Sequence, residues 1–197
     1  MRISLFSDLH GDILALERIL SQECEYYISI GDLSTFGRGL DRMGPALKKR
    51  ADRVYVLPGN HESEADNAKF CEQFGLRDFH VKTIGIAGYY LCGLGYSNIT
   101  PFRTPGEYTE EQIEEKLKPW ALRRPLILIC HCPPKDTALD RAGEGKHFGS
   151  GAVREFIDAN QPEYFFCGHI HEAEGAAEKL GKTRAFNVGK RGYVLEL

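Results

Sequence analysis

Residues 2–20, RISLFSDLHGDILALERIL, contain the pattern that decides the fold. Arg2–Ser7 is a short, mostly apolar run of the kind found in buried strands, and the apolar residues of 13–20 recur at helical spacing. Asp8 and His10 lie between the two segments, where the strand ends. A strand that passes through a short polar turn into a helix begins a βαβ unit, so this stretch predicts an α/β fold with parallel strands.

The rest of the chain repeats this rhythm, except in its middle. Apolar runs predict further strands at Tyr26–Ile30, Val54–Leu57, Pro125–Cys130, Tyr164–Cys167, Ala185–Val188 and Tyr193–Leu197. Helical patterns occur at Ala46–Arg50, Glu110–Leu117 and Ala152–Ala159. Val81–Gly95 is rich in glycine and β-prone residues without a helical pattern, which predicts antiparallel strands. We therefore expect residues 1–197 to form a single domain, a layered α/β sandwich in which two mixed sheets pack face to face with helices outside.

Composition limits the partners of the chain. With 42% hydrophobic and 27% charged residues and a formal charge of −3, it has no general attraction to nucleic acid or anionic lipid. The basic clusters Lys48–Arg50 and Arg123–Arg124 are short enough to be solvated surfaces. The apolar run before Asp8 is too short for a secretory signal, and no segment approaches the ~20 apolar residues that span a bilayer. We expect no membrane partner, a cytoplasmic location and six reduced cysteines, which show no CxxC spacing.

Polar clusters follow directly on five of the predicted strands. They are Asp8-Leu9-His10, Gly31-Asp32, Gly59-Asn60-His61-Glu62, His131 and Gly168-His169-Ile170-His171. Because the carboxyl ends of parallel strands line one crevice, we expect these five segments to meet at one site.

The side chains of these clusters are typical of a site for divalent transition-metal ions. Imidazole nitrogen combined with carboxylate and amide oxygen suits Zn, Mn, Fe, Co or Ni, whereas Ca and Mg prefer oxygen ligands. The i, i+2 spacing of Asp8 and His10, and of His169 and His171, places both side chains of each pair on one side of an extended segment. The glycines that precede three of the candidate ligands permit tight turns close to a ligand.

Each cluster also has a structural interpretation when it is taken alone. Gly31-Asp32 is common turn chemistry, Asn60 can cap a helix, and His61 can begin a helix packed against the site. Five clusters in one order, each at the end of a predicted strand, favour the metal site over five unrelated turns.

In this order the clusters resemble the signature of the calcineurin-like metallophosphoesterases, D-x-H, G-D, G-N-H-[DE], H and G-H-x-H. The match extends from Asp8 to His171, which is nearly the whole chain. The segments Ser7–Gly11 (SDLHG) and Asn187–Gly189 (NVG) are similar to the small bacterial and archaeal branch. The resemblance implies a four-layer αββα sandwich and a metal-dependent phosphoesterase acting on a small phosphorylated substrate.

The resemblance also implies a role for each residue of the site. The implied metal ligands are Asp8, His10 and His171 for one ion, Asn60, His131 and His169 for the other, and Asp32 for both. His61 would be the non-ligand histidine that protonates the leaving oxygen or stabilises its charge, and Glu62 would orient a neighbouring group. Two divalent ions roughly 3.5–4 Å apart would share a hydroxide that attacks phosphorus in line.

The same signature is compatible with several functions. Gly31–Arg38 (GDLSTFGR) lacks the second aspartate and the in-register arginine of protein Ser/Thr phosphatases and dinucleoside-tetraphosphatases, so their substrates are not expected. A phosphodiester is the expected substrate, a phosphomonoester of a small metabolite the alternative, and a non-catalytic protein-binding scaffold a distant third. Nucleases of this family usually add a DNA-binding cap, for which the chain has no room. The motifs leave the metal pair and the number of subunits open.

Two loop residues are further candidates for contacting the substrate. Arg38 follows the second cluster, and His147 lies on the loop Lys135–Gly149 between two ligand blocks. Ordinary surface positions are the simpler interpretation of both. His80 belongs to no pattern, and we expect it to be structural.

Overall fold

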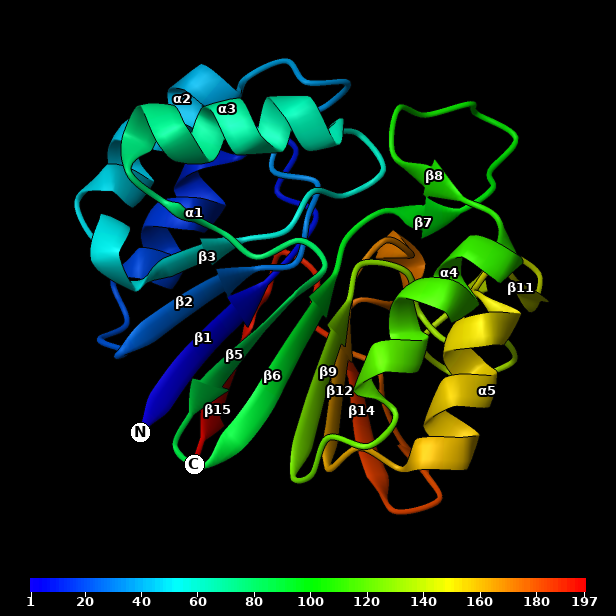
Figure 1. Ribbon diagram of the computed structural model, residues 1–197. Coiled ribbons are helices and arrows are strands. Elements are labelled where there is room, and N and C mark those ends of the chain that lie inside the picture. The colour runs from blue at the N-terminus through cyan, green and yellow to red at the C-terminus, as the bar shows by residue number, and fades with distance from the viewer.

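Two β-sheets packed face to face form the centre of the computed structural model, which describes residues 1–197 (Figure 1). The first sheet has the order β15-β1-β2-β3-β4, with the bounds Tyr193–Glu196, Arg2–Phe6, Tyr26–Ser29, Val54–Val56 and Arg77–Asp78. Strands β1 to β4 are parallel, and β15 pairs antiparallel with β1 at the edge.

The second sheet has the order β13-β14-β12-β9-β6-β5. Its strands are Ala177–Leu180, Thr183–Asn187, Tyr164–Cys167, Leu126–Cys130, Tyr89–Leu94 and Lys82–Ile86. The four inner strands are parallel, and the two edge strands are antiparallel to their neighbours. The antiparallel pair β5–β6 confirms the prediction for Val81–Gly95.

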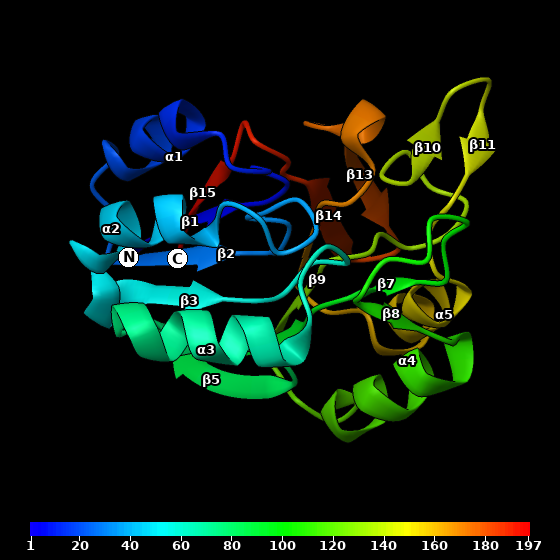
Figure 2. The same cartoon turned by 90° about the horizontal axis from the view of Figure 1, so that it is seen from above.

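Helices cover the outer face of each sheet. Helices α1 (Ile13–Leu20), α2 (Leu40–Lys48) and α3 (Glu64–Phe74) lie on the first sheet, and α4 (Glu110–Leu117) and α5 (Gly151–Asn160) on the second (Figures 1 and 2). The predicted four-layer αββα sandwich is therefore confirmed. None of these helices has the length and apolar character that crossing a bilayer requires.

Short elements complete the molecule. The small strand pairs are β7 (Ser97–Asn98) with β8 (Glu107–Tyr108), and β10 (Arg141–Ala142) with β11 (Lys146–His147). The 3-10 turns are η1 (Ala51–Arg53), η2 (Lys118–Trp120) and η3 (His171–Ala173). The two termini lie side by side, and the Met1 amino group donates to the Leu197 carbonyl oxygen over 2.8 Å (Figure 1).

The core explains why the inner strands are apolar on both faces. In β9, Ile127 and Ile129 pack between the sheets, whereas Leu126, Leu128 and Cys130 pack under α4 and α5. All five side chains are buried, and each apolar side chain of this size contributes about 1.5–3 kcal/mol by leaving water. Strands buried on both faces appear in the sequence as continuous apolar runs.

Helix α3 is the main element that the sequence does not predict. It begins after Ser63, whose hydroxyl accepts from the Asp66 backbone N–H, and ends at Gly75 in the left-handed conformation. Of its eleven residues only Asn67, Phe70 and Cys71 are buried, so its apolar periodicity is weak.

Candidate metal centre

Loops that follow five strands of the two sheets meet at one end of the sandwich. The Asp8 backbone N–H donates to the Gly31 carbonyl oxygen over 3.0 Å, and His10 N–H donates to the Asp32 carbonyl oxygen over 2.9 Å. In the other sheet, Gly168 N–H donates to the His131 carbonyl oxygen over 3.1 Å. These contacts hold each polar cluster against its neighbour, as expected for the carboxyl ends of parallel strands.

Three glycines allow this close approach. A Cβ atom built on Gly31 would lie 2.6 Å from the Gly59 Cα and 2.7 Å from the His131 Nδ1. A Cβ on Gly59 would overlap the Asp32 carboxylate, and one on Gly168 would overlap the Ser7 hydroxyl. Only Gly31 of the three has a positive φ, 113°. Space rather than backbone conformation therefore requires glycine before Asn60 and His169.

Four site residues other than glycine adopt the left-handed conformation. The φ angles are 57° for Asp8, 47° for His10, 51° for Asp32 and 68° for His169. Such a conformation costs of order 1 kcal/mol or more per residue and persists only where surrounding contacts enforce it. The same conformation occurs at other loop residues such as Val81 and Gln161, so it shows how tightly the site loops turn and does not by itself identify the site.

Potential ligand atoms form two adjoining groups. In one group, the His10 Nε2 and His171 Nε2 atoms are 3.1 Å apart, and the His171 Nε2 is 3.8 Å from the Asp8 carboxylate. In the other, the Asn60 Oδ1 lies 3.0 Å from the His131 Nε2 and 2.9 Å from the His169 Nδ1.

Asp32 lies between the two groups. Its Oδ2 is 3.7 Å from the His10 Nε2 and 3.5 Å from the His131 Nε2, so one carboxylate oxygen faces both groups. Ligand atoms of Asp32, His131 and His169 all lie within 4.8 Å of one another, as do those of Asp32, His10 and His61. All seven predicted ligands and His61 therefore come together.

The hydrogen bonds on the far side of two rings show which nitrogen atoms face the centre with a lone pair. His131 Nδ1 donates to the Ile30 carbonyl oxygen over 2.9 Å, and His10 Nδ1 donates to the Ser34 carbonyl oxygen over 2.9 Å. In the neutral rings each Nε2 is therefore unprotonated. The His131 Nε2 faces the Asn60 carbonyl oxygen over 3.0 Å, a position that either a proton on Nε2 or a metal ion bound by both atoms can satisfy. The residues present thus fit divalent metal ions.

The pKa values show how strongly the buried groups depend on each other. Burial raises the pKa of Asp8 to about 6. Burial would also raise the pKa of Asp32, but the adjacent His131 holds it below its ordinary value. The pKa of His131 is about 9 despite burial, because it faces that carboxylate. Burial, together with His131, lowers the pKa of His169 to about 3. Without ions, a proton on His131 supplies the positive charge that the cluster requires.

Glu62 fixes the backbone of the site. Its buried carboxylate accepts from the backbone N–H groups of Asp32, Ser34 and Gly59 over 2.8–3.0 Å, and from the Ser34 hydroxyl over 2.6 Å. This contact joins the loops after β2 and β3. Glu62 thus orients its neighbours, as predicted.

His61 is held beside the two groups by the loop that follows Asp32. Its Nδ1 accepts from the Phe36 backbone N–H over 3.3 Å, and the Phe36 ring packs edge-on against it with centroids 4.6 Å apart. With Nδ1 acting as acceptor, the proton of the neutral ring is on Nε2. No sequence pattern marks Phe36, since an aromatic residue in a polar loop has no characteristic spacing.

Asn187 is a second residue whose role was not predicted, although its motif was noted. Its buried side-chain nitrogen donates to the carbonyl oxygens of Leu139, Gly168 and Ile170 over 3.0–3.2 Å. It thereby fixes the loop that carries His169 and His171.

The remaining candidates take other positions. Arg38 is exposed, and its backbone pairs with Thr35 across a tight turn. His147 pairs with the buried Asp140 over 2.7 Å. His80 is buried, accepts from the Gly95 N–H and contacts the Tyr108 hydroxyl over 3.0 Å, as expected for a structural residue.

The comparisons with known proteins agree with this architecture. Residues 1–173 match the model of the calcineurin-like phosphoesterase family. An uncharacterized protein of Methanocaldococcus jannaschii is 31% identical over 202 residues, which cover 98% of this chain and 90% of that protein.

Two solved structures are similar in fold. A crystal structure of a Thermus thermophilus protein has a TM-score of 0.71 at 20% identity, covering 95% of this chain and 88% of that one. A crystal structure of phosphopantetheinyl hydrolase from Mycobacterium tuberculosis has a TM-score of 0.71 at 14% identity, with the same coverage. The chain belongs to the calcineurin-like phosphoesterase family, and that membership supports metal-dependent hydrolysis of phosphate esters.

Proposed function

We propose that the chain hydrolyses a phosphodiester with two divalent metal ions held at the candidate metal centre. The proposed ligands are Asp8, His10 and His171 for the first ion, Asn60, His131 and His169 for the second, and Asp32 for both. The observation that carries the proposal is the position of the Asp32 Oδ2, 3.7 Å from the first group at His10 and 3.5 Å from the second at His131. Mn, Fe, Zn, Ni and Co all suit these ligands.

When bound, such an ion pair supplies Lewis-acid activation of water and neutralises charge on the phosphoryl group. The protein contributes orientation and a hydrogen-bond donor. Asp8 and Asp32 offset two of the four positive charges, so the loaded site attracts an anion although the whole chain is acidic. The Nε2–H of His61 donates to the leaving oxygen, while Phe36 holds the ring through Nδ1.

Two observations favour a diester over a monoester. The loop of residues 31–38 places no arginine in the centre, because Arg38 is exposed, and a monoester dianion carries more charge to neutralise. A cavity of about 630 Å³ adjoins the site through His169 and His171 and has room for a second ester group.

The proposal extends to the chain as a whole. We propose that residues 1–197 act as one domain, because the two sheets that bear the site share one core between them. All six cysteines are buried and unpaired, which suits a reducing compartment such as the cytoplasm.

The test is hydrolysis of two 4-nitrophenyl esters, a diester and a monoester, by chelated protein refilled separately with Mn, Fe, Zn, Ni or Co. We expect the diester to have the higher kcat/KM with at least one ion. A higher kcat/KM for the monoester would favour the phosphomonoesterase. Inertness with every ion would leave the non-catalytic scaffold.

A further inference from the structure

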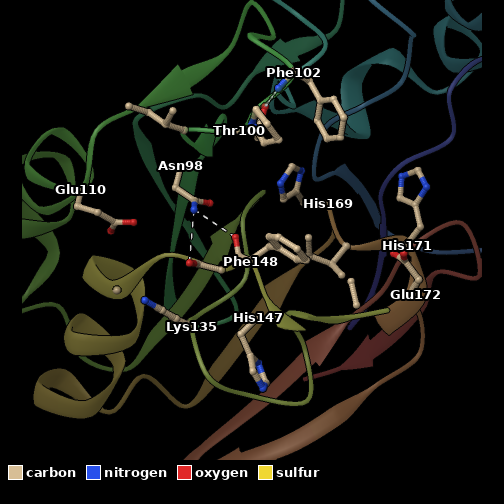
Figure 3. Close-up of a pocket in the computed structure, with 16 residues that line it drawn as sticks. Asn98, Thr100, Phe102, Glu110, Lys135, His147, Phe148, His169, His171 and Glu172 are labelled. Carbon is tan, nitrogen blue, oxygen red and sulfur yellow. Dashed lines mark hydrogen bonds between the residues drawn. The ribbon is translucent and has the colours of Figure 1, made fainter. Parts of the chain in front are cut away.

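The cavity beside the metal centre has an apolar wall that the hydrolysis of phosphate does not explain. His169 and His171 contribute to its lining, and two large apolar side chains lie on either side of His169 in the view of Figure 3, Phe102 above it and Phe148 below. Phe102 is 75% exposed, Ile99 65% and Phe148 47%. Exposed apolar residues that gather around one cavity, next to a reactive centre, are typical of a ligand-binding surface.

The loop that carries Ile99 and Phe102 is ordered by its own polar contacts. The Glu107 carboxylate accepts from the Thr100 hydroxyl over 2.6 Å, and from the Thr104 backbone N–H over 2.9 Å and the Thr104 hydroxyl over 2.6 Å. The exposure of Phe102 is therefore a property of a fixed loop.

This loop is also joined to the metal centre. The Asn60 side-chain nitrogen donates to the Thr104 hydroxyl over 3.2 Å, while the Asn60 Oδ1 faces His131 and His169. On the opposite side, Asn98 donates to the Phe148 carbonyl oxygen over 3.2 Å. The apolar wall is thus held at a set position relative to the candidate ligands.

The charged groups of the cavity lie at its margin, apart from Glu172, whose carboxylate lies beside His171 and disfavours an anionic group there (Figure 3). The Glu110 carboxylate already accepts hydrogen bonds from the Ser150 hydroxyl and the Ala152 backbone N–H. The His147 ring points away from Phe102 and His169 in Figure 3 and pairs with Asp140. Lys135 lies near α5, away from His171 (Figure 3). The space next to the metal centre therefore suits an uncharged group.

We propose that this cavity binds an uncharged, largely apolar organic group, such as an aromatic ring, esterified to the phosphate. The inference rests on the proposed phosphodiesterase function and names the class of its substrate: a small diester with one bulky apolar ester group. Ile99, Phe102 and Phe148 determine this specificity. The volume of about 630 Å³ matches pockets for small organic ligands, and a phosphate with a methyl group would leave most of it empty.

The test compares phenyl 4-nitrophenyl phosphate with methyl 4-nitrophenyl phosphate, which share one leaving group. After correction for the uncatalysed rates, we expect kcat/KM to be about tenfold or more higher for the phenyl ester. In the double variant Phe102→Ser/Phe148→Ser this preference should fall to within about threefold. Leu122→Ser is the matched control, because Leu122 is 94% exposed and does not line the cavity. It should keep the full preference.

A binding measurement separates this inference from the proposed function. Calorimetry with phenylphosphonate and methylphosphonate requires no turnover, and we expect the metal-loaded protein to bind the phenyl compound about tenfold more tightly. Equal rates for both esters with equal binding of both phosphonates would overturn the inference and leave the hydrolase proposal intact. Tighter phenylphosphonate binding, lost in the double variant, in a protein that hydrolyses nothing would support the cavity and overturn the hydrolase.

Discussion

Replacing Glu62 by glutamine tests whether one buried carboxylate holds the two central loops of the site together. The carboxylate accepts from the backbone N–H groups of Asp32 and Gly59 through Oε2, and from the Ser34 N–H and hydroxyl through Oε1. An amide keeps only one acceptor oxygen. If that oxygen stays on Asp32 and Gly59, the NH₂ group faces Ser34, whose hydroxyl can turn and accept from it, whereas the Ser34 backbone N–H loses its partner. One buried donor left without a partner costs about 1–3 kcal/mol.

The assay is urea unfolding of the chelated protein at pH 8. Burial and the nearby Asp32 raise the pKa of Glu62 to about 7, so the wild-type side chain is ionised at this pH. The ionised carboxylate carries a burial cost that the neutral glutamine avoids, and this offsets part of the loss. Glu64→Gln is the matched control, because Glu64 is exposed in the first turn of α3, and it should change stability by less than about 1 kcal/mol. Metal affinity should also fall, by about 10- to 100-fold. A Glu62→Gln protein with both the stability and the metal affinity of the Glu64→Gln control would refute this account of the loops.

The other predictions concern two residues of the metal centre, the glycine that precedes Asn60, and a buried histidine outside the centre. His61→Ala should lose about 100-fold or more in turnover and keep its metal content, whereas Asp32→Ala should lose both. Elemental analysis of the two purified variants, together with their turnover, checks this. Full activity of the Asp32 variant would be incompatible with the proposal. Gly59→Ala should lose metal and about 1–3 kcal/mol in urea unfolding, because its Cβ overlaps the Asp32 carboxylate, whereas Gly85→Ala, with open space around it, should not. Burial lowers the pKa of His80 to about 4 in the folded protein. As the pH falls, this histidine is therefore protonated in the unfolded chain before it is protonated in the folded one. The free energy of unfolding should decrease by up to about 3 kcal/mol between pH 6.5 and pH 4. His80→Gln should lessen that acid-side loss, and an unchanged pH dependence would contradict the assignment.

The layers of the fold were predictable because burial on both faces leaves a strong pattern. Strands such as β9 and β12 are continuous apolar runs, and their predicted bounds agree with the structure to within one residue at each end. Helix α3 was not predicted, since it is solvated over most of its surface and its hydrophobic pattern is weak. Strand β13 was missed for a related reason, because its charged residues lie at the exposed edge of the sheet.

The convergence of the site was also predictable, because polar residues at the carboxyl ends of parallel strands lie along the same edge. The contacts that orient the ligand side chains could not be predicted from the sequence. The carbonyl oxygens of Ile30 and Ser34, which orient two imidazole rings, belong to the backbone and are independent of residue identity. Phe102 was equally hard to identify, because its significance depends on an exposed position beside the cavity and not on a motif.

The central claim is that two ions share the carboxylate of Asp32. Anomalous diffraction from crystals of the manganese-loaded protein tests it most directly. We predict two peaks roughly 3.5–4 Å apart, one beside His10 and His171 and the other beside His131 and His169, with the Asp32 side chain in contact with both. A single peak, or two peaks of which one lies away from Asp32, would contradict the claim.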